Sequence, residues 1–259
     1  MDLGIAGRKA IVEAASKGLG KGCAMALAAE GCEVYVNARS ADVLEGAAEE
    51  IRAATGAKVV AIAGDVTKPE VRDAILAACP EPDILVTNAG GPPPGDFRTD
   101  TRERWLAAIE AQLLGHVDMI TRLVDGMADR EFGRIVNVTS QSVKMPVPNL
   151  GLSTATRLAL QGFTSTICRE LAGRNVVMNN LLPGPFETDR LRSGLAHAAQ
   201  KSNRDVEEVR ASRLAQVPAG RFGTAEEFGK VCAFLCSVHI GFMTGQSVLL
   251  DGGQYPGNF

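Results

Sequence analysis

"KAIVEAASKGLGKG" (residues 9–22) carries the pattern that decides the fold. A short apolar run ends at Glu13, and small residues at Ala14, Gly18 and Gly20 come before a helical segment. Small residues let the backbone turn tightly and approach a pyrophosphate, which then lies at the amino terminus of the helix. Glycine-rich turns are common, so the position between a first strand and its helix is what makes this turn a candidate dinucleotide site.

Short β-rich runs alternate with helical segments along the rest of the chain. The predicted strands cover residues 9–14, 32–37, 57–63, 83–90, 133–140, 176–184 and 246–253. Apolar strands interleaved with helices predict an α/β fold, a doubly wound (Rossmann-type) parallel sheet of about seven strands with helices on both faces. We expect a single domain over residues 1–259, with a polar helical insertion at about 185–217 over the substrate site. Ligands bind beyond the carboxyl ends of strands in such a sheet.

The composition excludes several functions. Apolar residues make up 46 % and charged residues 22 % of the chain, as in ordinary globular proteins. A net charge of −3 gives no basic footprint, so we expect no nucleic-acid partner. The amino terminus lacks a signal peptide and no apolar run reaches about 18–20 residues, which predicts a cytoplasmic protein without membrane contact. The six cysteines lack metal-site spacing, so we expect buried reduced thiols and no metal.

The end of the second predicted strand, "VNARS", indicates the cofactor. It offers no acidic residue to a ribose 2′-hydroxyl, but it offers Arg39, and Lys17 lies in the preceding turn. Arginine binds phosphate in a bidentate manner and lysine adds a point charge, so the pair predicts NADP(H) rather than NAD(H). The alternative is that both are solvated loop cations. Asp65 is positioned to accept a hydrogen bond from an adenine amino group, and the turn at residues 88–91 to pass beside a ribose.

Taken together, these features resemble the short-chain dehydrogenase/reductase family along essentially the whole chain, and most of all its 3-oxoacyl-acyl-carrier-protein reductase type. The motifs are the glycine turn, "GDVT" (64–67), "NAGG" (88–91), "GRIVNVTS" (133–140), "NNLLPGPFETDRL" (179–191) and the tail "TGQSVLLDGG" (244–253). The resemblance implies a small-molecule substrate and these cofactor-binding residues: Ala14, Ser16, Lys17, Gly18, Leu19, Gly20, Arg39, Asp65, Val66, Asn88, Gly90, Arg157, Pro183, Gly184 and Thr188.

The family's catalytic group is a serine, a tyrosine, a lysine four residues later and an asparagine from the preceding long helix. Ser140 occupies the serine position, but Ser153 stands for the tyrosine, Arg157 for the lysine and Gln112 for the asparagine. A serine hydroxyl is a far weaker acid than a phenol, and arginine stays protonated at neutral pH. Because losing a positioned general acid costs about 10²–10⁴ in rate, we expect weak reduction by the standard route.

Substitute proton donors are present in the sequence. Lys144 follows Ser140 by four residues and borders the expected pocket, although a solvated loop lysine is the alternative. Tyr255 could reach a site in its own or a neighbouring subunit, and the alternative is a tail residue that only packs at an interface. The candidate catalytic residues are therefore Ser140, Ser153, Arg157, Gln112 and Lys144.

Two functions remain open at this stage. The first is an NADP(H)-binding oxidoreductase that acts on a carbonyl or secondary alcohol, a 3-oxoacyl compound among the options, by a non-standard proton route. The second is a catalytically impaired dinucleotide-binding sensor or oligomerisation module. The resemblance also implies a homotetramer or homodimer formed through the last helix and strand, and the apolar run Val248–Leu250, expected at a sheet edge, agrees.

Overall fold

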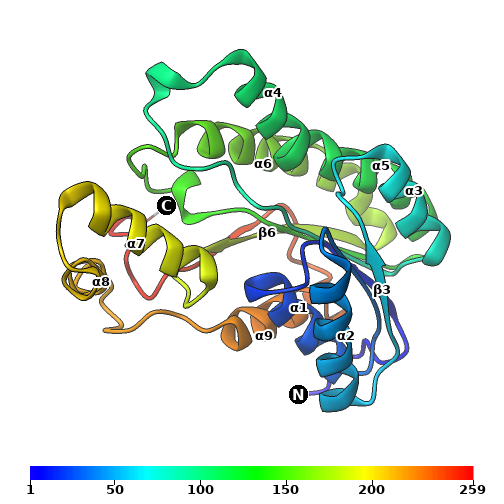
Figure 1. Ribbon diagram of the computed structural model, residues 1–259. Helices are drawn as coiled ribbons and strands as arrows, with labels where there is room; N and C mark the ends of the chain where they lie inside the picture. Colours follow the sequence, from blue (N-terminus) through cyan, green and yellow to red (C-terminus); the bar gives the residue numbers. More distant parts are fainter. Residues whose placement is uncertain (259) are drawn as a thin grey trace.

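The computed structural model describes residues 1–258, and its centre is one seven-stranded parallel sheet (Figure 1). The strands stand in the order β3-β2-β1-β4-β5-β6-β7. They are β1 (Lys9–Val12), β2 (Glu33–Ala38), β3 (Val59–Ala63), β4 (Ile84–Thr87), β5 (Gly133–Val138), β6 (Val176–Pro183) and β7 (Ser247–Leu250). The predicted α/β fold with a doubly wound sheet is confirmed.

Two helical layers cover the sheet because alternate strand residues face opposite sides. Val12 belongs to the apolar cluster shared with α1 (Gly18–Ala29), α2 (Ala41–Thr55) and α9 (Ala225–Leu235). The adjacent Ile11 belongs to the cluster shared with α3 (Pro69–Ala78), α5 (Gly115–Asp129) and α6 (Gly151–Leu171). The inner strands of the sheet are therefore buried on both faces, as their near-continuous apolar sequences predict, whereas the edge strands β3 and β7 are half-buried.

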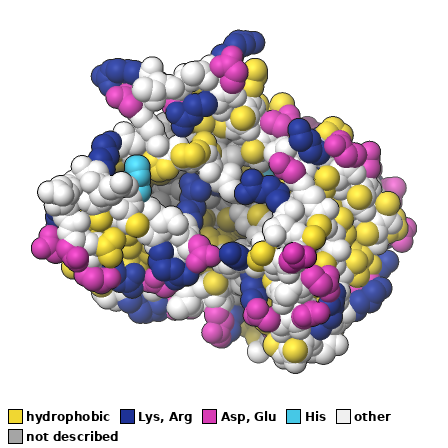
Figure 2. Space-filling view, in the orientation of Figure 1, with side chains coloured by type: hydrophobic (Ala, Val, Ile, Leu, Met, Phe, Trp, Pro, Cys, Tyr) yellow, Lys and Arg dark blue, Asp and Glu magenta, His cyan; other side chains and the backbone are white. Residues whose placement is uncertain are grey.

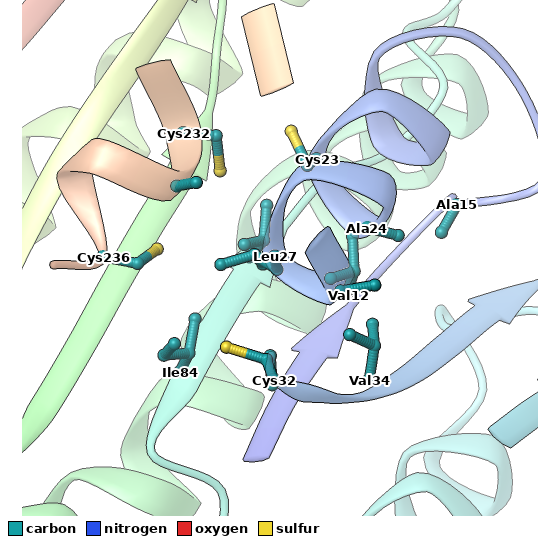
Figure 3. Packing of buried hydrophobic residues seen from close by; sticks show 14 of the residues in the cluster. Val12, Ala15, Cys23, Ala24, Leu27, Cys32, Val34, Ile84, Cys232 and Cys236 are labelled. Atoms are coloured by element: carbon teal, nitrogen blue, oxygen red, sulfur yellow. The ribbon is translucent and has the colours of Figure 1, made fainter. Parts of the chain in front are cut away.

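Helices α1 and α9 cross in direct backbone contact. A Cβ atom on Gly229 would overlap the carbonyl oxygen of Gly22, so only glycine allows this approach. Cys23 from α1 faces Cys232 from α9 in the buried layer beneath the crossing (Figure 3). All six cysteines are buried and unpaired, which confirms the prediction of reduced thiols.

Several predicted strands end earlier than expected. Strand β4 ends at Thr87 rather than at residue 90, and β7 ends at Leu250 rather than at residue 253. Gly252 and Gly253 adopt φ values of +66° and +85°, which no extended strand contains. The residues after each strand are consequently loops at the carboxyl edge of the sheet.

The segment at 185–217 forms two helices, α7 (Asp189–Ser202) and α8 (Val206–Leu214), which project beyond the carboxyl ends of the strands (Figure 1). Helix α7 begins where the Thr188 hydroxyl accepts a hydrogen bond from Leu191 N at 3.3 Å, a capping contact. Within residues 1–258, no helix is both long and apolar enough to cross a membrane.

Candidate active site

The glycine turn after β1 and the loop after β4 meet at the point where the strand order reverses. The side-chain nitrogen of Asn88 lies 3.0 Å from the position of a Cβ atom on Gly20, and that Cβ would also overlap the carbonyl oxygen of Ala14. Only glycine at position 20 therefore lets α1 pack against the turn. A crevice at such a reversal is where doubly wound sheets bind dinucleotides.

Ala14 adopts the left-handed conformation, with φ +48°. The turn thus keeps the shape that a glycine would give it, at a cost of about 1–2 kcal/mol for a residue with a side chain. Compared with a glycine at this position, Ala14 makes the turn less stable but leaves its backbone conformation unchanged.

The amino terminus of α1 is suited to an anion. Lys17 is the N-cap residue, its side chain forms no capping hydrogen bond, and the first turn contains no acidic residue. The backbone N–H groups of the first turn of a 12-residue helix are left to bind a pyrophosphate. The side chains of Lys17 and Arg39, which follow β1 and β2, are both exposed, and Lys17 forms an ion pair with Asp189 at 3.8 Å. The residues present therefore fit a dinucleotide with a 2′-phosphate.

The remaining predicted cofactor residues lie along the same edge of the sheet. Asp65 and Val66 follow β3, Gly90 follows β4, and Gly184 follows β6, whose last residue is Pro183. A Cβ on Gly184 would lie 2.6 Å from Asp251 Cα, so this loop also depends on glycine. All of these residues lie at the carboxyl edge of the sheet. Their individual contacts with the cofactor stay predictions.

Arg157 lies half-buried at the carboxyl end of β5. Its Nη1 donates to the carbonyl oxygens of Val138 at 2.8 Å and Thr139 at 2.7 Å, immediately before Ser140. Burial, and then the positive charge of Arg190, lowers the pKa of Arg157 to about 10. The guanidinium is therefore still protonated at neutral pH, but it is held by neutral main-chain groups.

Gln112 connects the long helix that contains α4 (Arg102–Ile109) and α5 to helix α6. It lies in a π-helical turn (Glu110–Leu114) that interrupts the long helix between α4 and α5. Its amide nitrogen donates to Thr156 Oγ1 at 2.8 Å and Ser153 Oγ at 3.2 Å, and its oxygen accepts from Arg157 Nη2 at 2.8 Å. Three of the five predicted catalytic residues, Gln112, Ser153 and Arg157, thus form one hydrogen-bonded group.

Ser140 and Lys144 flank a 3-10 turn. The Ser140 hydroxyl accepts from Ser142 N at 3.1 Å, and half-buried Lys144 follows the turn. The two tyrosines are Tyr35 in β2 and Tyr255 in the C-terminal tail. Tyr35 donates to Glu33 at the start of β2, and a Cβ on Gly257 would overlap the Tyr255 hydroxyl. The Tyr255 hydroxyl therefore lies next to the backbone of Gly257, and a role for Tyr255 at the site of its own or a neighbouring subunit stays a prediction.

The sequence reasoning missed a buried acid–histidine pair beside the glycine turn. Glu13 is 0 % and His116 3 % exposed, and His116 Nδ1 lies 2.9 Å from Glu13 Oε2. The same oxygen accepts from the backbone N–H of Asn88 at 3.3 Å. The only signal was that Glu13 stands where the family usually has threonine.

Arg190 is the second residue that sequence reasoning missed. It belongs to the first turn of α7, and its guanidinium donates to the carbonyl oxygens of Gly91 at 3.2 Å and Pro92 at 3.4 Å. Helix α7 thereby contacts the loop after β4 across the site. Figure 2 shows a hollow on this face of the molecule, with Lys and Arg side chains on both sides of it.

These observations define a nucleotide-binding protein of the doubly wound class, with polar side chains gathered next to its cofactor crevice. Residues 14–254 match the family model described as enoyl-(acyl carrier protein) reductase. The chain is 31 % identical over 252 residues to an NADPH-dependent reductase, BacG, of Bacillus subtilis, covering 95 % of this chain and 97 % of that protein. The chain belongs to the short-chain dehydrogenase/reductase family.

Two further comparisons agree with this assignment. The chain is 33 % identical over 257 residues to the 3-oxoacyl-[acyl-carrier-protein] reductase FabG of Vibrio cholerae, covering 98 % of this chain and 99 % of the relative. It superposes with a TM-score of 0.93 and 28 % identity on L-sorbose reductase from Gluconobacter frateurii complexed with NADPH and L-sorbose, covering 100 % of both chains. The predicted resemblance to the 3-oxoacyl-acyl-carrier-protein reductase type is confirmed.

Proposed function

We propose that this protein is an NADP(H)-dependent oxidoreductase that interconverts a carbonyl group and a secondary alcohol by a proton route without tyrosine. The observation that supports it most directly is the group of Ser153, Gln112 and Arg157 beside the cofactor crevice, with Ser140 at the end of β5. The named NADPH-dependent relatives support the cofactor, and a 3-oxoacyl compound is one candidate substrate.

The proposed roles of the residues follow from their hydrogen bonds. When bound, NADPH supplies the hydride for the carbonyl carbon. Ser153 Oγ accepts from Arg157 Nε at 3.3 Å and from the Gln112 amide at 3.2 Å, so its own hydrogen is left to bind the carbonyl oxygen. Ser140 donates a second hydrogen bond to that oxygen. Together with the charge of Arg157, they stabilise the developing alkoxide.

Proton transfer is the step for which this chain lacks the family's residue, the catalytic tyrosine. Arg157 does not deliver it at neutral pH, because its pKa of about 10 keeps the guanidinium protonated. In the proposal the Lys144 ammonium, or a water molecule bound at Ser140, gives the proton to the alkoxide oxygen. The proposed contact of Arg157 with the nicotinamide ribose would use Nη2. This atom donates to Ala89 O at 3.5 Å, which is the longest hydrogen bond of the guanidinium and the easiest to exchange.

A second candidate function, a dinucleotide-binding module without catalysis, has one specific observation in its favour. The N–H groups of Arg157 are directed at protein acceptors, which are Val138 O, Thr139 O, Ala89 O, Ser153 Oγ and the Gln112 amide. With these bonds, Arg157 holds the segments after β4 and β5 together whether or not the protein turns over a substrate.

The proposal includes assembly into a homodimer or homotetramer in the cytoplasm. A groove of about 860 Å³ between α1 and α9 is lined by apolar groups that include Met25, Ala233 and the exposed Phe234, and β7 is an edge strand. The apolar residues in this groove, which Lys21, Glu30, Glu226 and Lys230 also line, favour pairing with another copy, and so does an edge strand. The six unpaired cysteines support a reducing compartment. A stable monomer in sedimentation at micromolar concentration would refute the assembly.

The catalytic proposal is tested by single-turnover oxidation of NADPH across a panel of ketones, keto esters and oxo acids. We expect at least one compound to consume NADPH above background, and Ser140→Ala to slow that reaction by about 10²-fold or more. An absence of consumption with every compound would leave the module without catalysis as the better account.

A further inference from the structure

Arg190 lies beside the proposed catalytic residues, but the proposed mechanism gives it no role. A Cβ atom on Gly91 would lie 2.9 Å from Arg190 Nη2, 3.2 Å from the Gln112 amide and 3.4 Å from Ser153 Oγ. Three polar side chains from α7, the π-helical turn and α6 thus converge on one point of the loop after β4. Arg190 stands next to the serine that is proposed to bind the carbonyl oxygen.

The guanidinium of Arg190, an exposed residue, has no carboxylate partner in the described part of the chain. Within residues 1–258, no carboxylate oxygen lies within 4.0 Å of its guanidinium, whose two hydrogen bonds go to backbone carbonyls at 3.2 and 3.4 Å. Its neighbour Arg192 binds Asp189 at 2.5 Å and Glu187 at 3.6 Å. The acidic groups at the start of α7 therefore already have arginine partners.

Arg157 adds a second uncompensated cation to the same pocket. In the described part of the chain it forms no ion pair, and its hydrogen bonds go to neutral oxygens. The electrostatic effect of Arg190 on Arg157 appears as a lowered pKa, the second cause after burial. Two cations with only neutral partners give a pocket a positive potential, which attracts an anionic ligand group.

We infer that Arg190 is a specificity-determining residue that binds the carboxylate of the substrate. This inference rests on the proposed function and narrows its substrate to an oxo acid, or in reverse a hydroxy acid. Because Arg190 and Ser153 approach the same point, the carboxylate and the reacting carbonyl are one or two carbons apart. The planar guanidinium binds a carboxylate through two parallel N–H donors. On binding, the carboxylate replaces the carbonyl oxygens of Gly91 and Pro92, which Arg190 contacts through long hydrogen bonds.

A matched substrate pair tests the inference. Pyruvate, phenylpyruvate and acetoacetate are each compared with the corresponding methyl ester, with NADPH, by kcat/KM. The wild-type protein should prefer at least one acid over its ester by more than tenfold. Arg190→Met should lower kcat/KM for that acid by about 30- to 100-fold and lower it much less for the ester, so the preference is lost. Arg190→Lys should restore part of it.

The control is Arg192→Met, which removes a cation of the same helix that is already paired with Asp189 and Glu187. It should leave the ratio of acid to ester within about twofold, since long-range charge effects are screened. Calorimetric titration of NADPH into Arg190→Met shows whether the cation serves the cofactor instead. A loss of NADPH affinity as large as the loss of acid turnover would overturn the inference.

The outcomes separate the inference from the proposed function. Reduction of neutral ketones and esters without preference for any acid would overturn the role of Arg190 and leave carbonyl reduction standing. Binding of an acid to the NADPH complex that Arg190→Met abolishes, without NADPH consumption, would support Arg190 and refute the reductase. If no acid binds and none is turned over, the inference is wrong.

Discussion

His116 Nδ1 and Glu13 Oε2 lie 2.9 Å apart in a region where both side chains are almost fully excluded from solvent. The contact joins α5 to the end of β1. The same Glu13 oxygen also receives the backbone N–H of Asn88 from the end of β4. This one carboxylate therefore connects both strands that flank the cofactor crevice to the helix behind them.

The first prediction concerns the free energy of this contact. Glu13→Ala and His116→Ala should each lower the free energy of unfolding by about 1–3 kcal/mol, because each removes the ion-pair partner of a buried polar side chain. The double variant should cost less than the sum of the two single variants, with a coupling of about 1–3 kcal/mol in chemical denaturation. The exposed pair Glu226–Lys230 is the control and should show little coupling. Additive effects of Glu13→Ala and His116→Ala would contradict the pair.

The second prediction concerns the strained residue of the glycine turn. Ala14→Gly should raise the free energy of unfolding by up to about 1 kcal/mol, because relief of the left-handed φ exceeds the added flexibility of the unfolded chain. Ala15→Gly is the matched control: Ala15 is fully buried and is not among the positive-φ residues, so this change should destabilise the protein. Equal losses from both glycine substitutions in thermal unfolding would show that position 14 is not strained.

The third prediction concerns the choice between cofactors. Arg39→Asp removes an exposed cation at the end of β2 and supplies a carboxylate for a ribose hydroxyl. Calorimetry should show NADPH affinity falling by about 10- to 100-fold while NADH affinity rises, which reverses the order of the two. Arg98→Asp, an exposed change in another loop, should leave the order unchanged. Equal affinities of the wild-type protein for both dinucleotides would remove the assigned role of Arg39.

The fourth prediction restores the family's proton donor. Ser153→Tyr combined with Arg157→Lys should increase ketone reduction by at least about tenfold if the pocket is otherwise intact. The same variant should unfold at lower temperature, since a lysine cannot hold the carbonyl oxygens of Val138 and Thr139 as the Arg157 guanidinium does. Arg157→Lys alone measures that loss of stability. Unchanged or slower reduction by a folded double variant would indicate a pocket that no longer accepts the standard reaction.

The doubly wound fold class and the position of the glycine turn were predictable because they depend on local patterns. Apolar runs and the glycine turn around Gly18 each occupy a few consecutive residues, and their alternation specifies the doubly wound sheet. The π-helical turn that holds Gln112 was not predictable, since no local signal distinguishes it from a continuous helix. Arg190 contacts Gly91 at a separation of 99 residues in the sequence, and the Glu13–His116 contact is equally long-range. Tertiary packing alone brings such residues together.

Carbonyl reduction without a catalytic tyrosine is the central claim, and label transfer from NADPH tests it most directly. With NADPH deuterated at its transferable hydrogen, the account predicts that deuterium appears at the new carbinol carbon of the alcohol product. Ser140→Ala should reduce this transfer by about 10²-fold or more. A variant with both Tyr35→Phe and Tyr255→Phe should keep it. Absence of deuterium in every product, or loss of transfer in the tyrosine-free variant, would contradict the account.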